Sequence, residues 1–99
     1  MPGVTEPAGV RVVNNPEQSR YEVFCDGQLA GFSTYRLRPG KVVVLHTEID
    51  DAFEHHGLGG MLAAGLLDDI RRRGLHVVPR CPFVAAYIHD HPEYEDLVG

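Results

Sequence analysis

Four side chains able to move protons or accept an acyl group are His46, Glu48, Cys81 and Tyr87. An unperturbed imidazole titrates near pH 6.5 and an unperturbed glutamate near pH 4.3, so His46 and Glu48 are both candidate general bases. The Cys81 thiolate could act as a nucleophile, or the residue could be a small buried side chain without a chemical role. Tyr87 could donate a proton, or it could be a half-buried core tyrosine.

A glycine-rich loop forms a second candidate site. Residues 54–60 read Glu-His-His-Gly-Leu-Gly-Gly and stand directly before a predicted helix. Glycines at this junction let backbone N–H groups of the first helical turn approach an anion, especially a pyrophosphate. They could also serve only a tight turn and close packing. The spacing departs from the dinucleotide fingerprint, and the phosphate-binding Walker lysine is missing.

The elements that position these residues come from two unlike halves. Four runs rich in β-branched residues predict an antiparallel meander, at 10–14, 20–25, 28–37 and 41–49. Asp26-Gly27 and Pro39-Gly40 predict the turns between them. Alternation in the last strand predicts that Val42, Val44, His46 and Glu48 share one face, and that Val43, Leu45, Thr47 and Ile49 share the other.

The second half has a helical period. An apolar stripe from Leu58 to Ile70 predicts an amphipathic helix, with three arginines in its last turn and Gly74 as its stop. A short strand over 75–79 then predicts the return limb of a βαβ crossover. A second helix is predicted over 83–90 and a helical turn over 93–98, whereas residues 1–9 are predicted to be flexible.

This order of elements resembles the GNAT superfamily of N-acetyltransferases. Its loop signature is Gln or Arg, two residues, Gly, one residue, then Gly or Ala, and residues 54–59 match it except at Glu54. The resemblance is stronger to a compact YjdJ-like subgroup, through His46-Thr47-Glu48-Ile49, the 53–59 loop and the run from Cys81 to Tyr94. It covers residues 10–98 and implies an α+β, minimal GNAT-like fold with a βαβ crossover and a C-terminal helix.

The resemblance also implies roles for individual residues. Backbone N–H groups of the loop would bind the CoA pyrophosphate, while Glu48 and Ile49 would pair with the pantetheine arm and could polarise the thioester carbonyl. Glu48 would be the base, directly or through water, with His46 as its rival, and Tyr87 would lie near the CoA sulfur. The acetyl donor would be acetyl-CoA. The loop residues concerned are His56, Gly57, Leu58, Gly59 and Gly60.

Composition limits the remaining possibilities. Ninety-nine residues, 43% of them hydrophobic, allow a single domain, predicted over residues 10–98. A net charge of −5 disfavours nucleic acid as a partner but leaves room for a local basic pocket that takes a phosphorylated small molecule. No apolar run approaches the length of a membrane span. Two widely spaced cysteines and no secretory leader predict a cytoplasmic protein without a disulfide scaffold.

Two other functions remain open at this stage. A non-catalytic acyl-CoA-binding module would keep the glycine loop without turnover. A histidine-rich metal site could use His46, Glu48, His55 and His56, with His89 and His91, although the spacing lacks an HExxH or CxxC motif, so no metal ligands are predicted. The sequence identifies neither the amine acceptor nor the oligomeric state. It is compatible with an amine of a small molecule or of a protein.

Overall fold

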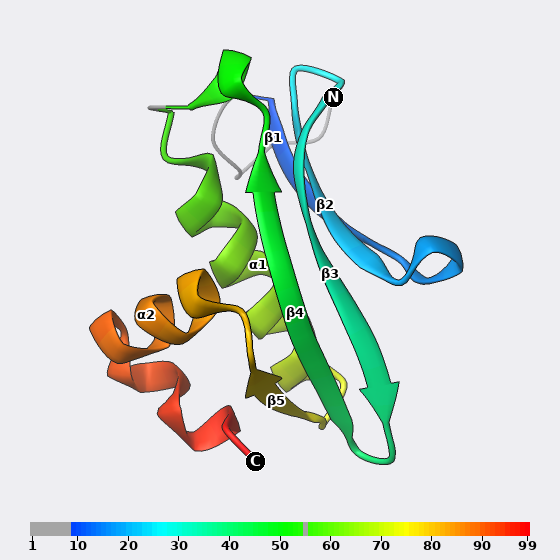
Figure 1. Ribbon diagram of the computed structural model, residues 1–99, viewed down its shortest axis with the longest axis vertical. Coiled ribbons are helices and arrows are strands. Elements are labelled where there is room, and N and C mark those ends of the chain that lie inside the picture. The colour runs from blue at the N-terminus through cyan, green and yellow to red at the C-terminus, as the bar shows by residue number, and fades with distance from the viewer. Residues whose placement is uncertain (1–8, 55) are drawn as a thin grey trace.

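A five-stranded sheet organises the chain, and its spatial order is the chain order (Figure 1). The computed structural model describes residues 9–54 and 56–99. The strands are β1 Val10–Asn15, β2 Arg20–Cys25, β3 Gln28–Arg38, β4 Lys41–Ile49 and β5 His76–Pro79. All neighbours are antiparallel except β4 and β5, which are parallel. The predicted α+β architecture, a meander followed by a βαβ crossover, is therefore confirmed.

Two helices pack on one face of this sheet. They are α1 Leu58–Arg72 and α2 Pro82–Asp90, and short 3-10 turns occur at η1 Pro16–Gln18, η2 Asp51–Phe53 and η3 Pro92–Leu97. Only η1 lies between β1 and β2. No helix in the described residues is long and apolar enough to cross a membrane. The predicted flexible segment over 1–9 lies outside the described residues, apart from Gly9.

Local signals in the sequence set the ends of these elements. Asp26 and Gly27 both have positive φ, +52° and +83°, as a two-residue hairpin turn requires. Helix α1 ends at Arg72 and is capped by Arg73, and the next residue, Gly74, has a φ of +71°. The N–H of Leu75 donates to the carbonyl of Ile70 at 3.1 Å. This bond and the one from the Gly74 N–H to Arg71 form a Schellman motif.

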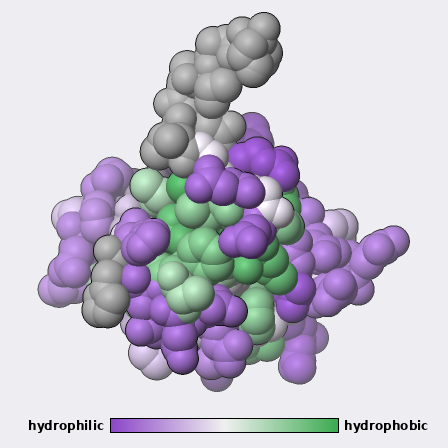
Figure 2. All heavy atoms as spheres, turned by 90° about the horizontal axis from the view of Figure 1, so that it is seen from above, coloured by the Kyte–Doolittle hydropathy of each residue, from purple (hydrophilic) through white to green (hydrophobic). Residues whose placement is uncertain are grey.

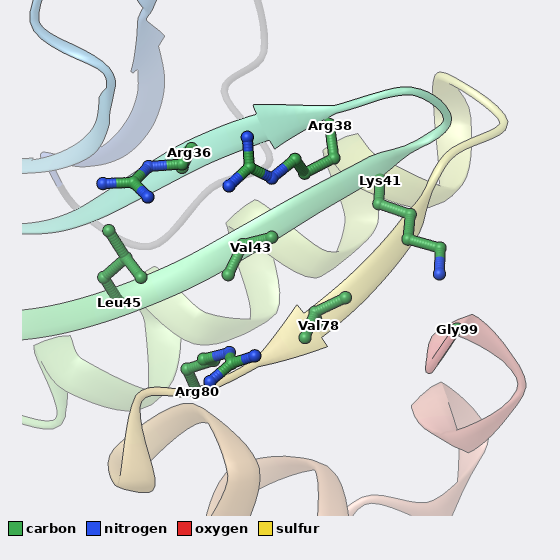
Figure 3. Close-up of a pocket in the computed structure, with 8 residues that line it drawn as sticks. All are labelled: Arg36, Arg38, Lys41, Val43, Leu45, Val78, Arg80 and Gly99. Atoms are coloured by element: carbon green, nitrogen blue, oxygen red, sulfur yellow. The ribbon is translucent and has the colours of Figure 1, made fainter.

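The core lies between the sheet and the two helices. Val42, Val44 and Val77 are fully buried beneath α1, whose Leu62 and Leu66 are also inaccessible. The alternate residues of β4 and β5 point away from the helices, and neither α1 nor α2 covers that side in the described part of the chain (Figures 1 and 3). We call these two sides the covered face and the open face.

A β-bulge at Leu45 corrects the predicted faces of β4. Val44 pairs with Tyr35 and His46 pairs with Thr34, so Leu45 is an extra residue without its own partner. The extra residue reverses the alternation beyond it. The prediction that His46 and Glu48 share a face with Val42 and Val44 is therefore wrong. Those two side chains lie on the open face, and Thr47 and Ile49 turn toward the core.

Candidate functional site

The glycine loop leaves the first turn of α1 available to a ligand. Gly57 is the N-cap residue, with φ at +72°, and no side chain caps the helix. A glycine is needed here because a left-handed φ strains other residues. The N–H groups of the first turn, whose partial positive charge favours anions, therefore have no side-chain partner at this end.

Gly59 and Gly60 have different roles in this loop. A Cβ on Gly59 would lie 2.8 Å from the tip of the Phe83 ring of α2, so the ring would have to move if any other residue stood there. A Cβ on Gly60 would be 3.7 Å from Tyr87, an ordinary contact, and its φ is not in the left-handed region. Neither packing nor backbone conformation explains Gly60. A helix would be more stable with Ala there, by about 0.5–1 kcal/mol.

A cavity of about 330 Å³ opens beside the loop. Its apolar walls come from β4, η2, α1 and α2. Figure 2, which views this end of the molecule, shows apolar residues ringed by polar ones. The size falls within the usual range for small-molecule sites. The lining residues are Ile49, Phe53, Glu54, Gly57, Leu58, Gly59, Gly60 and Phe83.

The parallel strands separate next to this cavity. Pairing of β4 with β5 ends at Val44 and Pro79, and the N–H groups of Arg80 and Cys81 both donate to the Val44 carbonyl, at 3.0 and 2.9 Å. Strand β4 then continues to Ile49 without a partner on that side in the described pairing. The result is a strand edge that leads from the glycine loop to Cys81, with backbone groups available for pairing.

On the covered face, polar side chains form a buried chain of hydrogen bonds. The Cys81 Sγ donates to the Thr47 Oγ1 at 3.3 Å, and this oxygen lies 2.7 Å from the Ser33 Oγ. Cys81 is 2% exposed and Ser33 is 1% exposed. The thiol is thus held at the start of α2 with a partner already in place.

On the open face, the two candidate bases lie together in solvent. The His46 Nε2 is 3.3 Å from the Glu48 Oε2, and the side chains are 59% and 61% exposed. Either group can exchange protons with water, and each can accept a proton from a nucleophile that approaches from this side. The structure thus joins His46 with Glu48 and separates both from Cys81 by the thickness of the strand.

Tyr87 faces α1 rather than the open face. Its ring stacks on His91 with centroids 3.9 Å apart and lies near Gly60. Burial raises the pKa of the Tyr87 phenol, and the nearby carboxylates of Glu93 and Asp68 add to the effect. Tyr87 therefore carries its proton at neutral pH, and its ring lies beside the first turn of α1.

Several site residues had no assigned role in the sequence. Thr47 and Ser33 hold Cys81, and Phe83 forms a wall of the cavity. Position 83 could have been found because it lies one helical turn before Tyr87 and so on the same side of α2. His55 lies outside the described residues. Among the residues that are described, no three His, Cys, Asp or Glu side chains gather as a metal site would require.

Comparison with protein families agrees with this geometry. The model described as GCN5-related N-acetyl-transferase matches residues 20–97, which includes the glycine loop, the separated strands and both helices. The chain belongs to the GCN5-related N-acetyl-transferase family. The GNAT resemblance is thus confirmed at the level of the superfamily.

Solved structures show the same fold. Ard1 from Thermoplasma volcanium superposes with a TM-score of 0.53 at 23% sequence identity. The match covers 65% of this chain and 44% of the Ard1 chain, so the chain corresponds to less than half of that protein. A comparison with curated proteins gives no match. Membership of the GCN5-related family thus rests on the family model, and the fold on the model and the structure together.

Proposed function

We propose that the chain is a compact, YjdJ-like acetyltransferase that moves an acetyl group from acetyl-CoA to an amine. The observation that carries this proposal is the uncapped glycine loop at the start of α1, joined to the unpaired edge of β4. Family membership supports the reaction class. Loss of acetyl-CoA binding on changing this loop would be its most direct test.

The chain's residues fit this donor. Backbone N–H groups of His56, Gly57, Leu58, Gly59 and Gly60 would bind the pyrophosphate, and the space beside Gly60 would admit it. Ile49 lines the adjoining cavity at the start of the free edge, where an amide-containing arm could add to the sheet as a further strand does. An arm that follows this edge would bring its thioester toward Val44 and Cys81.

The chemistry then requires a base and an acid. The amine nitrogen attacks the thioester carbonyl, a C–N bond forms, the C–S bond breaks and CoA leaves as a thiolate. Glu48 accepts the proton that the amine loses, directly or through water, with His46 as the alternative base. Tyr87 is the candidate acid that protonates the thiolate. Backbone N–H groups of the β4 edge would stabilise the negative charge on the carbonyl oxygen.

A route through Cys81 would use a different first step. The thiolate would take the acetyl group from CoA and transfer it to the amine in a second step. The burial of Cys81 and its bond to Thr47 favour direct transfer, because the thiol must first be exposed to react. Mass spectrometry after incubation with acetyl-CoA, together with the rate of Cys81→Ser, separates the routes. An acetylated Cys81 and an inactive variant would establish the covalent one.

A matched pair of substitutions tests the donor site. Glu at position 60 suits the first turn of a helix, because its charge complements the helix dipole, but it would repel a pyrophosphate. We expect Gly60→Glu to retain or raise the thermal midpoint and to weaken acetyl-CoA binding by about a hundredfold, measured by calorimetry. Gly60→Gln, of the same shape, should weaken it less. Equal affinities for Gly60→Glu and the unchanged chain would place the donor elsewhere.

A second experiment tests catalysis. The double variant His46→Ala, Glu48→Ala should keep acetyl-CoA affinity and lose transfer to a panel of primary amines. Because both side chains are exposed, the fold should be unaffected. Unchanged transfer would remove both residues from the mechanism. Donor binding without transfer to any amine by the unchanged chain would favour an acyl-CoA-binding module instead.

A further inference from the structure

A second cavity lies on the open face of the sheet, away from the glycine loop. It is a groove of about 600 Å³ (Figure 3). Arg36 and Arg38 line it from β3, Lys41 lies at the start of β4, and Arg80 follows β5. We call it the basic groove. The other lining residues are Val43, Leu45, Val78 and Gly99.

The charge of the basic groove opposes that of the whole chain. It holds four of the nine Lys and Arg residues, including the single lysine, although the net charge is −5. Among the described residues, none of the four cations forms a salt bridge, whereas the arginines at 20, 71, 72 and 73 all do. Concentrated cations without carboxylate partners attract an anion from solution. Arginine offers forked donors that suit phosphate and carboxylate oxygens.

The floor of the groove is apolar, so a ligand that fills the groove needs an apolar part as well as an anionic group. Val43, Leu45 and Val78 are aliphatic and lie between the cations, as the sticks in Figure 3 show. Leu45 is 39% exposed because it lies on the open face, two residues after Val43. An apolar stem would cover these side chains while an anionic group meets the arginines. The volume suits a small molecule.

The position of the groove connects it with the candidate bases. Leu45 lines the groove, and the next residue is His46, on the same open face. Glu48 lies three residues beyond Leu45, about 10 Å at the usual rise of a strand. The sheet thus presents cations at one end of the open face and the acidic Glu48 at the other, and Asp50 and Asp51 follow β4 in the chain. A molecule with an anionic group and an ammonium group would be oriented by this field.

We infer that the acceptor is a small primary amine that also carries an anionic group, a phosphate or a carboxylate, bound in the basic groove. The inference rests on the proposed acetyl transfer and specifies its substrate. The anionic group binds Arg36, Arg38, Lys41 and Arg80, the apolar stem covers Leu45, and the amine reaches Glu48 and His46. The acetylated product keeps the anionic group and loses the positive charge of the amine.

The test compares amines that differ only in the distal group. Linear aminoalkyl phosphates, the matching carboxylates and the matching amino alcohols are assayed with acetyl-CoA. We expect kcat/KM to be about tenfold to a hundredfold higher for one or both anionic series than for the alcohols, with most of the difference in KM. Whichever anionic series is preferred identifies the oxyanion. Equal kcat/KM for alcohols and anions would overturn the inference and leave the proposed transfer standing.

Neutral variants of the groove locate the effect. The triple variant Arg36→Gln, Arg38→Gln, Lys41→Gln should lose the preference for anionic amines, keep transfer to amino alcohols and keep acetyl-CoA affinity. Arg11→Gln is the control, an exposed arginine of β1 outside the groove. The contrary outcome is a triple variant that loses acetyl-CoA affinity by the same factor as it loses kcat/KM for the anionic amines. In that case the groove holds the donor's phosphates and the inference is wrong.

A binding measurement judges the inference without turnover. Aminoalkyl phosphate or carboxylate should shift the amide NMR signals of Leu45 and Val78, and the amino alcohol should not. If these shifts occurred without any transfer, the proposed function would fail, while the assignment of the basic groove to an amine with an anionic group would stand. Shifts caused only by an acidic peptide, such as polyglutamate, would make the groove a protein-docking surface and overturn the small-molecule assignment.

Discussion

The two faces of β4 carry different kinds of chemistry. On the covered face, Thr47 and Cys81 are held in a buried hydrogen-bond chain that ends at Ser33. On the open face, the His46 and Glu48 side chains are more than half exposed and contact each other. The extra residue Leu45 reverses the alternation of β4, and this puts Thr47 on the covered face and His46 and Glu48 on the open face. Residues of similar polarity on a single strand therefore have structural roles on one side and can contact substrate on the other.

This comparison also separates how two ligands would be recognised. The glycine loop offers backbone N–H groups, which depend on helix geometry more than on side-chain identity. The basic groove offers side chains from three strands, so its specificity depends on individual residues. We therefore expect substitutions of His46 and Glu48 on the open face to change activity without changing stability, and substitutions in the Thr47 hydrogen-bond chain of the covered face to lower stability.

The largest expected effect is on the open face. Glu48→Gln preserves the shape of the side chain and removes its ability to accept a proton. We expect kcat to fall about a hundredfold or more, while the thermal midpoint stays unchanged because the side chain is 61% exposed. Steady-state kinetics and thermal melts measure the two effects. Glu17→Gln, in η1, is the control, and an unchanged kcat would mean that Glu48 is not the base.

The next effect is on the covered face, where Tyr21 of β2 is fastened to α1. Its hydroxyl donates to the Asp69 Oδ2 at 2.6 Å and accepts a hydrogen bond from the Arg73 Nη1 at 3.3 Å. We expect Tyr21→Phe to lower the free energy of unfolding by about 1–3 kcal/mol, because Asp69 loses a donor. Urea denaturation at neutral pH measures this, with kcat unchanged. No loss of stability would show that water replaces the hydroxyl.

Tyr21 also gives stability a dependence on alkaline pH. Burial, and after it the bond to Asp69, raises the pKa of Tyr21. Above about pH 10 the unfolded chain releases a proton that the folded chain retains, so the free energy of unfolding falls as pH rises. Tyr21→Phe should flatten this fall relative to the unchanged chain. Parallel slopes for the two proteins would exclude Tyr21 as the source.

A smaller effect is expected from the hydrogen-bond chain. Thr47→Val leaves the buried Ser33 hydroxyl without its partner, which costs about 1–2 kcal/mol. The double variant Thr47→Val, Ser33→Ala removes both polar groups and should recover part of that loss. A double-mutant cycle measures this, from the free energies of unfolding of the two single variants, the double variant and the unchanged chain. Additive losses would mean that the two hydroxyl groups do not interact in solution.

The smallest effect concerns Glu54, which departs from the family motif and lines the donor cavity. The cavity adjoins the loop at which we propose that the pyrophosphate binds, and like charges repel. We expect Glu54→Gln to tighten acetyl-CoA binding by about threefold to tenfold at low salt, and less at high salt. Calorimetry at two salt concentrations measures this. Weaker binding would indicate that Glu54 orders the loop.

Much of the fold follows from signals that lie close together in the chain. Asp26-Gly27 predicted a hairpin, and Gly74 predicted the end of α1, because each position needs a positive φ. The apolar stripe placed Leu62, Leu66 and Ile70 in the core, where they are fully buried. The loop before α1 was equally readable, since its glycines and its place before a helix are local properties.

The remaining features depend on strand register and on contacts between residues far apart in the chain, which the alternation of a single strand does not predict. Leu45 fits the alternation of β4, so nothing in its neighbours signals an extra residue, and the predicted face of Glu48 was wrong. Thr47 and Cys81 are far apart in the chain and meet only because β4 and β5 pair as far as Val44. The cations at 36, 38 and 41 could have been grouped from the hairpin, but Arg80 joins them only through the parallel strand.

The order of the strands has a consequence for how the molecule assembles. Strands β1 to β4 are joined by short connections and pair with their chain neighbours, so this part involves little loop-closure entropy. Strand β5 follows α1 in the chain, so it can pair with β4 only after the chain of α1 has crossed the face of the sheet. We expect the meander to form early and the parallel pair to close late. A donor that binds between β4 and β5 would then slow unfolding, since release of β5 would require its departure.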